Sequence, residues 1–179
     1  AILGLDEPMV TRACREASQD QVVSLANINA PGQIVIAGEL GAVARAGQRA
    51  KALGARRVLP LAVSAPFHCV LMQPAQDRLE PELRSLVVSD PTVPVVANLD
   101  AEPKRDAGSA IAALVHQVTA PVKWEEVVRR LLSEGVDTFV EVGPGRVLSG
   151  LIRKIERGAR SLSVSDPEGV ERAVAALAT

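Results

Sequence analysis

The sequence predicts a mixed α/β (α+β) fold with two parts: a ferredoxin-like βαββαβ subdomain over residues 1–63 and a parallel-sheet α/β part over residues 64–179. Three observations predict it. The first part shows the order strand, helix, strand, strand, helix, strand, and the second alternates short β-rich runs with helical periodicity. In addition, 47% of the 179 residues are hydrophobic, which is enough to build a packed core.

The first helix is predicted from its cap and its apolar stripe. Asp6 is the expected N-cap, and Pro8 lies in the first turn, where proline is tolerated. Apolar residues recur at helical spacing, and these are Val10, Ala13, Cys14 and Ala17. We expect this stripe to face the core of the subdomain.

The other elements of the first part follow in order. Residues 22–28 and 33–37 are expected strands about a Pro31-Gly32 turn. Residues 39–53 are an expected second helix, and residues 57–63, which are mostly apolar, are expected to form a buried strand.

The second part begins with a helix whose leucines recur at about helical spacing from Leu71 to Leu86. Residues 93–97, 138–142 and 161–164 are expected strands because they are β-rich. Three short strands are too few for a well-covered parallel sheet, so we expect their edges to need partner strands. Residues 100–108 carry many charges and a proline, and are expected to be the most mobile loop.

Composition excludes several classes of protein. The 20 basic and 21 acidic residues give a net charge of −1, which provides no electrostatic case for nucleic-acid or membrane binding. Aromatic residues make up only 2%, with no tyrosine, so base-stacking platforms are not expected. The two cysteines, Cys14 and Cys69, fit neither a metal site nor a disulfide framework. They indicate a reducing, cytoplasmic location.

One of the two histidines occupies a short loop, Ser64 to Met72, between an expected strand and an expected helix. A histidine held there can take up and return a proton at neutral pH, so His68 is a candidate general base. The alternative is that it caps a helix or fills a gap. Cys69 is expected to be a small buried residue, and His116 to lie on the solvated side of its helix.

Four segments, in the same order, resemble the malonyl-CoA:acyl carrier protein transacylases of fatty acid synthesis. They are the Asn-rich hairpin Asn27 to Gly38, the histidine loop Ser64 to Met72, Gln117 with Pro121-Val122-Lys123-Trp124, and the strand-turn-helix Glu141 to Leu148. The resemblance covers essentially the whole chain.

The resemblance implies that residues 64–179 form the C-terminal part of an α/β-hydrolase-like large domain. Members of the family carry their nucleophilic serine in Gly-His-Ser-x-Gly, and no Gly-His-Ser occurs in these 179 residues. The chain is therefore expected to be the C-terminal portion of such an enzyme, and to be inactive alone.

The resemblance also implies the reaction. Malonyl passes from malonyl-CoA to a serine ester and then to the phosphopantetheine thiol of acyl carrier protein, with no bound cofactor and no metal. His68 is the implied catalytic base, and the backbone carbonyl of Gln117 is the implied group that holds its ring. Two alternatives stay open: an inert docking module for a carrier protein, and an acyltransferase domain of a polyketide synthase.

Three further residues are candidates for substrate binding. Phe67 precedes His68 and, beside the acyl pocket, favours malonyl over methylmalonyl, although it could equally be a core aromatic residue. Asn27 and Asn29 are expected to line the acyl-CoA cleft, or else to serve turn chemistry near the hairpin.

Overall fold

The computed structural model describes residues 1–178, which form two compact units, Ala1–Val127 and the residues from Val128 onward. The boundary falls within helix α5 (Trp124–Ser133). The predicted division between residues 63 and 64 lies inside the first unit. That residues 1–63 are a separate subdomain therefore stays a prediction.

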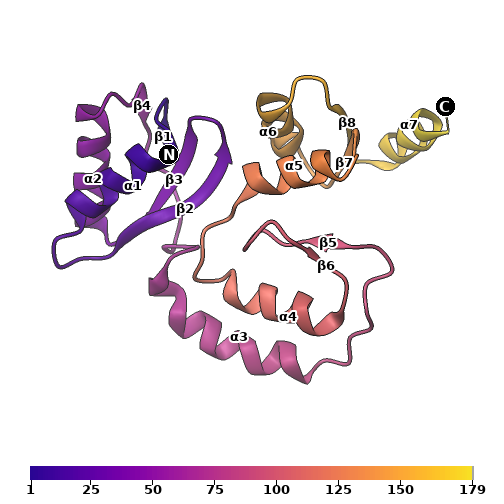
Figure 1. Ribbon diagram of the computed structural model, residues 1–179, viewed down its shortest axis with the longest axis horizontal. Coiled ribbons are helices and arrows are strands. Elements are labelled where there is room, and N and C mark those ends of the chain that lie inside the picture. Colours follow the sequence, from indigo (N-terminus) through magenta and orange to yellow (C-terminus); the bar gives the residue numbers. More distant parts are fainter. Residues whose placement is uncertain (179) are drawn as a thin grey trace. The chain divides into compact units, whose positions relative to one another are not determined.

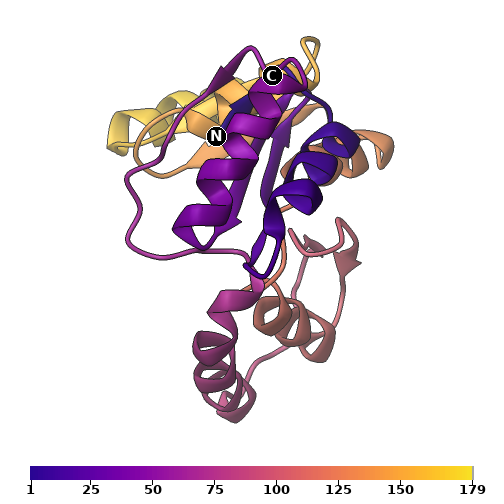
Figure 2. The ribbon, with the colours of Figure 1, turned by 90° about the vertical axis from the view of Figure 1, so that its left-hand side faces the viewer.

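The first unit contains a four-stranded sheet with the order β2-β3-β1-β4, in which every neighbouring pair is antiparallel. Its strands are β1 (Ile2–Leu3), β2 (Val23–Ala30), β3 (Gln33–Gly38) and β4 (Arg57–Val58). Helices α1 (Glu7–Ser18) and α2 (Leu40–Ala52) lie on the same face of this sheet (Figures 1 and 2). This strand order and helix placement confirm the ferredoxin-like prediction.

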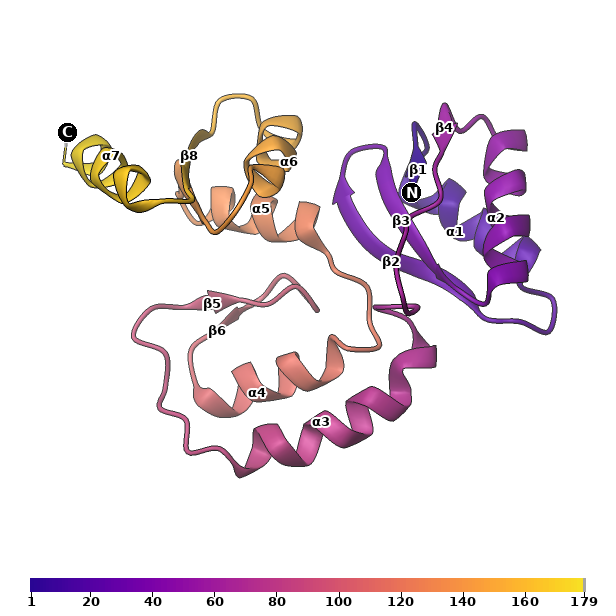
Figure 3. The ribbon, with the colours of Figure 1, turned by 180° about the vertical axis from the view of Figure 1, so that it is seen from behind.

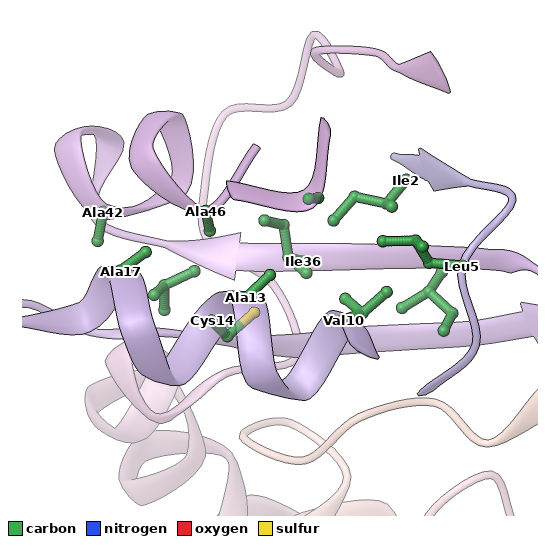
Figure 4. Packing of buried hydrophobic residues seen from close by; sticks show 12 residues of the cluster. Ile2, Leu5, Val10, Ala13, Cys14, Ala17, Ile36, Ala42 and Ala46 are labelled. Atoms are coloured by element: carbon green, nitrogen blue, oxygen red, sulfur yellow. The ribbon is translucent and has the colours of Figure 1, made fainter. Parts of the chain in front are cut away.

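Helix α1 begins where its cap was predicted. The Asp6 carboxylate accepts a hydrogen bond from the Met9 amide at 3.0 Å, which satisfies a backbone group that the helix leaves free. All four residues of the predicted stripe are buried: Val10, Ala13, Cys14 and Ala17. They pack against Ala42, Ala46 and Ala50 of α2 and against the sheet (Figure 4). Short side chains on both helices allow close packing.

The β2–β3 hairpin ends at a residue that has to be glycine. A Cβ atom on Gly38 would lie 2.1 Å from the carbonyl oxygen of Val22, which is a clash with backbone. Next to it, the Glu39 carboxylate accepts a hydrogen bond from the Val22 amide at 2.7 Å. These contacts place the start of α2 beside the start of β2.

The prediction of a buried strand over residues 57–63 was wrong in length and in burial. Only Arg57–Val58 pair with β1, and residues 59–63 form no strand. Leu61 is 49% exposed and Val63 is 65% exposed. An apolar run forms a strand only where a neighbouring strand pairs with it. Because β1 forms only two register pairs with β4, the strand ends after Val58.

The rest of the first unit is mainly helical. Its elements are the short 3-10 helix η1 (Val70–Met72), α3 (Gln73–Ser85), β5 (Val95–Val96), β6 (Pro103–Lys104) and α4 (Ala107–His116). Helices α3 and α4 lie side by side (Figures 1 and 3). The predicted strand over residues 93–97 is shorter than expected, and it pairs antiparallel with β6.

The loop predicted over residues 100–108 is largely structured. It contains β6 and the start of α4, whose N-cap Asp106 accepts a hydrogen bond from the Ser109 amide at 2.8 Å. Ala101 is buried, and Lys104 forms an ion pair with Asp100 at 2.5 Å. Charge and a proline favoured a loop, but here the charges serve as a cap and an ion pair.

The second unit contains a parallel strand pair joined through a helix. Its elements are β7 (Thr138–Val142), α6 (Val147–Ile155), β8 (Arg160–Val164) and α7 (Pro167–Leu177). Five register pairs join β7 to β8, from Thr138 with Arg160 to Val142 with Val164. The two strands predicted here are confirmed. Among residues 1–178 no helix is both long enough and apolar enough to cross a membrane.

Candidate active site

His68 lies in a loop that hydrogen bonds hold on both sides. Its backbone has φ of +61°, a conformation that is uncommon for residues other than glycine. The Cys69 thiol donates to the carbonyl of Pro66 at 3.1 Å, and the Met72 amide donates to the carbonyl of Cys69 at 2.9 Å. Cys69 is 1% exposed, so it is a buried structural residue. The loop thus holds His68 in a defined position just before η1.

The ring of His68 has one hydrogen-bond partner that determines its protonation pattern. Its Nδ1 lies 3.0 Å from the backbone carbonyl oxygen of Gln117. A carbonyl can only accept, so Nδ1 carries the proton and, in the neutral ring, Nε2 keeps a free lone pair. His116, by contrast, is exposed on α4. The geometry therefore gives His68 the form that a general base needs.

The carbonyl of Gln117 is placed by the fold around it. Gln117 is the C-cap of α4. A few residues on, Val122 adds to the free edge of β2: its amide donates to Ala26 and its carbonyl accepts from Ile28, both at 2.8 Å. This parallel bridge links the chain that follows Gln117 to the ferredoxin-like sheet.

A groove of about 830 Å³ opens beside the histidine loop, within the first unit. Its walls come from the start of the chain, from β2, β3 and α2, and from residues 58–68, and they include His68, Phe67 and Asn27. Phe67 is 48% exposed, so its ring faces the open space rather than a core. The volume is in the range of small-molecule sites.

The structure brings together three of the five predicted site residues in this groove. Asn27 lies beside a β-bulge at Ala26, where the register of β2 against β3 shifts. Bulges often change the direction of a side chain near active sites. Asn29 and Gln117 do not line the groove, although Gln117 touches the His68 ring through its carbonyl. The functional roles of all five stay predictions.

Sequence reasoning missed two polar residues, Gln76 and Thr119, which stand eight residues after His68 and two residues after Gln117. The Thr119 hydroxyl donates to the Gln76 side-chain oxygen at 2.7 Å. In the sequence, each stands in a stretch with no motif, so only the fold reveals the pair.

No cluster of three or more His, Cys, Asp and Glu side chains suited to a metal ion is found in the described part of the chain. Of the two thiols, Cys14 lies in the core, and burial raises its pKa to about 11. It therefore stays protonated and unreactive at neutral pH.

The fold and the site agree with a family of group-transfer enzymes. Residues 3–175 match the acyl transferase domain family, so the chain belongs to that family. Among curated proteins it is 46% identical over 174 residues to the malonyl CoA-acyl carrier protein transacylase of Salmonella typhimurium, covering 97% of this chain and 56% of that protein. The Bacillus subtilis protein of the same name is 42% identical over 178 residues, covering 99% and 56%.

Solved structures are similar as well. One is a malonyl-transacylase in complex with a type II PKS acyl-carrier protein, with a TM-score of 0.94, 45% identity, and coverage of 98% of this chain and 57% of that chain. Another is an acyl carrier protein S-malonyltransferase from Vibrio cholerae, with a TM-score of 0.93, 42% identity, and coverage of 97% and 56%. The chain thus spans little more than half the length of the relatives it matches.

Proposed function

We propose that the protein containing this chain transfers a malonyl group from malonyl-CoA to the phosphopantetheine thiol of acyl carrier protein, and that His68 is its general base. The observation that carries the proposal is the 3.0 Å contact between His68 Nδ1 and the Gln117 carbonyl, beside an apolar groove. The names of the relatives support the substrate and the acceptor. No Gly-His-Ser-x-Gly occurs in these 179 residues, so the proposal places the nucleophilic serine outside them.

In the first half-reaction, Nε2 of His68 takes the proton of the serine hydroxyl while the serine oxygen attacks the malonyl thioester. The same nitrogen returns the proton to the coenzyme A thiolate as the carbon–sulfur bond breaks. In the second half, Nε2 takes the proton of the phosphopantetheine thiol, whose sulfur attacks the serine ester. The proton then passes to the departing serine oxygen. The Gln117 carbonyl keeps Nδ1 protonated and so stabilises the imidazolium in both halves.

The groove residues supply binding in this proposal. Phe67 limits the space beside the α-carbon of the acyl group, which favours malonyl over methylmalonyl. Asn27 offers an amide to the acyl-CoA in the groove, and Asn29 lies two residues further along the same strand. We also propose a reducing, cytoplasmic location, which the two free buried cysteines support.

A second candidate is the same transfer to the carrier protein of a polyketide synthase. It is favoured by the similarity to the malonyl-transacylase solved with a type II PKS acyl-carrier protein. Malonyl transfer to fatty-acid and polyketide carrier proteins, measured side by side, separates the two.

The experiment is to measure malonyl transfer by the full-length parent protein and its variants. His68→Ala should lower the rate by roughly 10²–10⁴-fold, the usual contribution of a positioned acid–base group. His116→Ala, which removes the other histidine, and Gln117→Ala, which keeps the backbone carbonyl, should retain activity.

Two results would overturn the proposal: a full-length protein that does not transfer malonyl to any carrier protein, or a His68→Ala variant as fast as His116→Ala. The 179-residue chain by itself should show no turnover, because a base without a nucleophile has nothing to activate.

A further inference from the structure

Gln76 stands out because it is a buried polar side chain on an otherwise exposed helix. It is 8% exposed, and within α3 it is the one residue that is buried. Its side-chain oxygen accepts a hydrogen bond from the Thr119 hydroxyl at 2.7 Å. Leu79, on the next turn of α3, is 39% exposed. Leu83 is half-buried and no apolar side chain of α3 is fully buried, so apolar burial only partly fixes how α3 lies against the chain near Thr119.

The two partners flank the proposed catalytic contact in the sequence. Gln76 lies eight residues after His68, and Thr119 lies two residues after Gln117. The His68–Gln117 and Gln76–Thr119 hydrogen bonds thus join the same two segments of the chain at two points. With both bonds made, the two segments are restrained from sliding along each other or rotating about a single contact.

A directional bond matters here because apolar contacts tolerate small displacements, whereas a hydrogen bond weakens steeply with distance and angle. A shift of α3 would be passed through η1 and the adjoining Met72–Cys69 hydrogen bond to the histidine loop. That shift would lengthen the contact between Nδ1 of His68 and the Gln117 carbonyl.

We propose that Gln76 and Thr119 are positioning residues for His68: their hydrogen bond holds the histidine loop against the Gln117 carbonyl, and so maintains the Nδ1-protonated form of the ring. Its importance for catalysis rests on the proposed function. The coupling between the two hydrogen bonds does not depend on the proposed function, since it is a property of this chain.

The test uses nitrogen-detected NMR of the two histidine rings in the 179-residue chain, at a pH where both are neutral, to measure the ratio of Nδ1-protonated to Nε2-protonated ring. Thr119→Val and Gln76→Met each remove the hydrogen bond at nearly constant volume, and Thr119→Ser keeps the hydroxyl. Gln73→Met is the matched control, because Gln73 makes an equally short 2.7 Å bond to Asp77 on the exposed side of the same helix. His116 is the internal reference.

At His68 the ratio should fall by about two- to fivefold in Thr119→Val and in Gln76→Met, because the weakened contact loses part of a hydrogen bond. Thr119→Ser and Gln73→Met should leave the ratio at His68 unchanged. The ratio at His116 should stay the same in every variant. The double variant should change the ratio no more than the larger single change, because the two residues form one bond.

An unchanged ratio in Thr119→Val, with circular dichroism showing a folded chain, would overturn the proposal, and so would an equal fall in Gln73→Met. If Gln76→Met does not fold, Thr119→Val and Thr119→Ser decide the question. The measurement needs no substrate. A full-length protein that lacks malonyl transfer but shows this coupling would therefore contradict the proposed function alone.

Discussion

Adjacent residues of the histidine loop face different surroundings. The His68 ring meets the carbonyl of Gln117, while the Phe67 ring lines the groove and is half exposed. Cys69, the next residue, is buried. Because successive side chains diverge, one short loop can hold a histidine ring against a carbonyl, form part of the groove wall and bury a cysteine.

At this scale we predict that Phe67→Ser in the full-length parent relaxes discrimination against methylmalonyl-CoA. Removing the ring opens volume in the groove, and under the proposed function a branched α-carbon would lie there. The expected change in the ratio of kcat/KM values is about 1–3 kcal/mol, the ordinary value of one methyl group in an apolar pocket. Leu40→Ser, which removes another groove side chain far along the sequence, is the control. An unchanged ratio for Phe67→Ser would leave Phe67 as a packing residue.

Helix α6 is anchored by a carboxylate from the preceding strand. Its N-cap residue, Arg146, makes no side-chain capping bond. Instead, Glu141 of β7 accepts from the amides of Leu148 and Ser149 at 3.0 and 2.8 Å, and from the Ser149 hydroxyl at 2.6 Å. That hydroxyl also lies 3.1 Å from the Ser163 hydroxyl on β8. A negative charge at a helix N-terminus is favourable. Glu141 therefore stabilises the connection between β7, the turn and α6.

The pKa of Glu141 reflects these contacts. Burial by itself would raise it, but the hydrogen bonds from Ser149 and from the Leu148 amide outweigh that effect and lower the pKa below its ordinary 4.5. Because the folded-state pKa is the lower one, the contribution to stability is complete above the ordinary value. It is lost as the pH falls through the folded-state value.

We therefore predict that Glu141→Gln destabilises the second unit by about 1 kcal/mol at pH 7, since hydrogen bonds to a charged group are replaced by weaker ones. The difference from the wild type should shrink as the pH falls below the ordinary value of 4.5 and through the lowered pKa of Glu141. Urea unfolding at several pH values measures it, with the exposed Glu171→Gln as the control. A difference that is independent of pH would show that the charge of Glu141 is not what stabilises α6.

The two units of the molecule differ in how completely their strands are paired and covered by apolar side chains. In the first, a cluster of buried residues joins both helices to the sheet, and β2 is paired with β3 on one edge and with Val122 on the other. In the second, β7 pairs with β8 alone within the described residues. Val140 and Val142 of β7 are 40% and 79% exposed while Phe139 is buried, so one face of this strand lacks apolar cover.

At the scale of the whole chain we predict slow hydrogen exchange in β2 and β3 and fast exchange in β7. Amides in a strand with two paired edges and a packed face open only with the unit as a whole, whereas those of a thinly covered strand open locally. Native-state exchange followed by mass spectrometry would show it. Equal, strong protection of residues 23–38 and 138–142 would contradict this view of the second unit.

The sequence predicted mainly those features of the fold that depend on local interactions. The cap at Asp6 and the stripe from Val10 to Ala17 involve residues three or four apart, so helix geometry alone gives their arrangement. The strand order followed because the βαββαβ pattern has one common antiparallel arrangement. His68 became a candidate base through its loop and through the resemblance, since a motif keeps its spacing in the sequence, and that role stays a prediction.

Tertiary structure decided what depends on distant residues. The strand predicted over residues 57–63 ends after two residues, because pairing needs a neighbour and β1 supplies only two pairs. The addition of Val122 to β2 and the Gln76–Thr119 bond join residues that are 43 or more positions apart in the chain. The groove is built from several separate elements. No local pattern encodes such contacts, since they form only when helices and strands pack and leave specific polar groups facing each other.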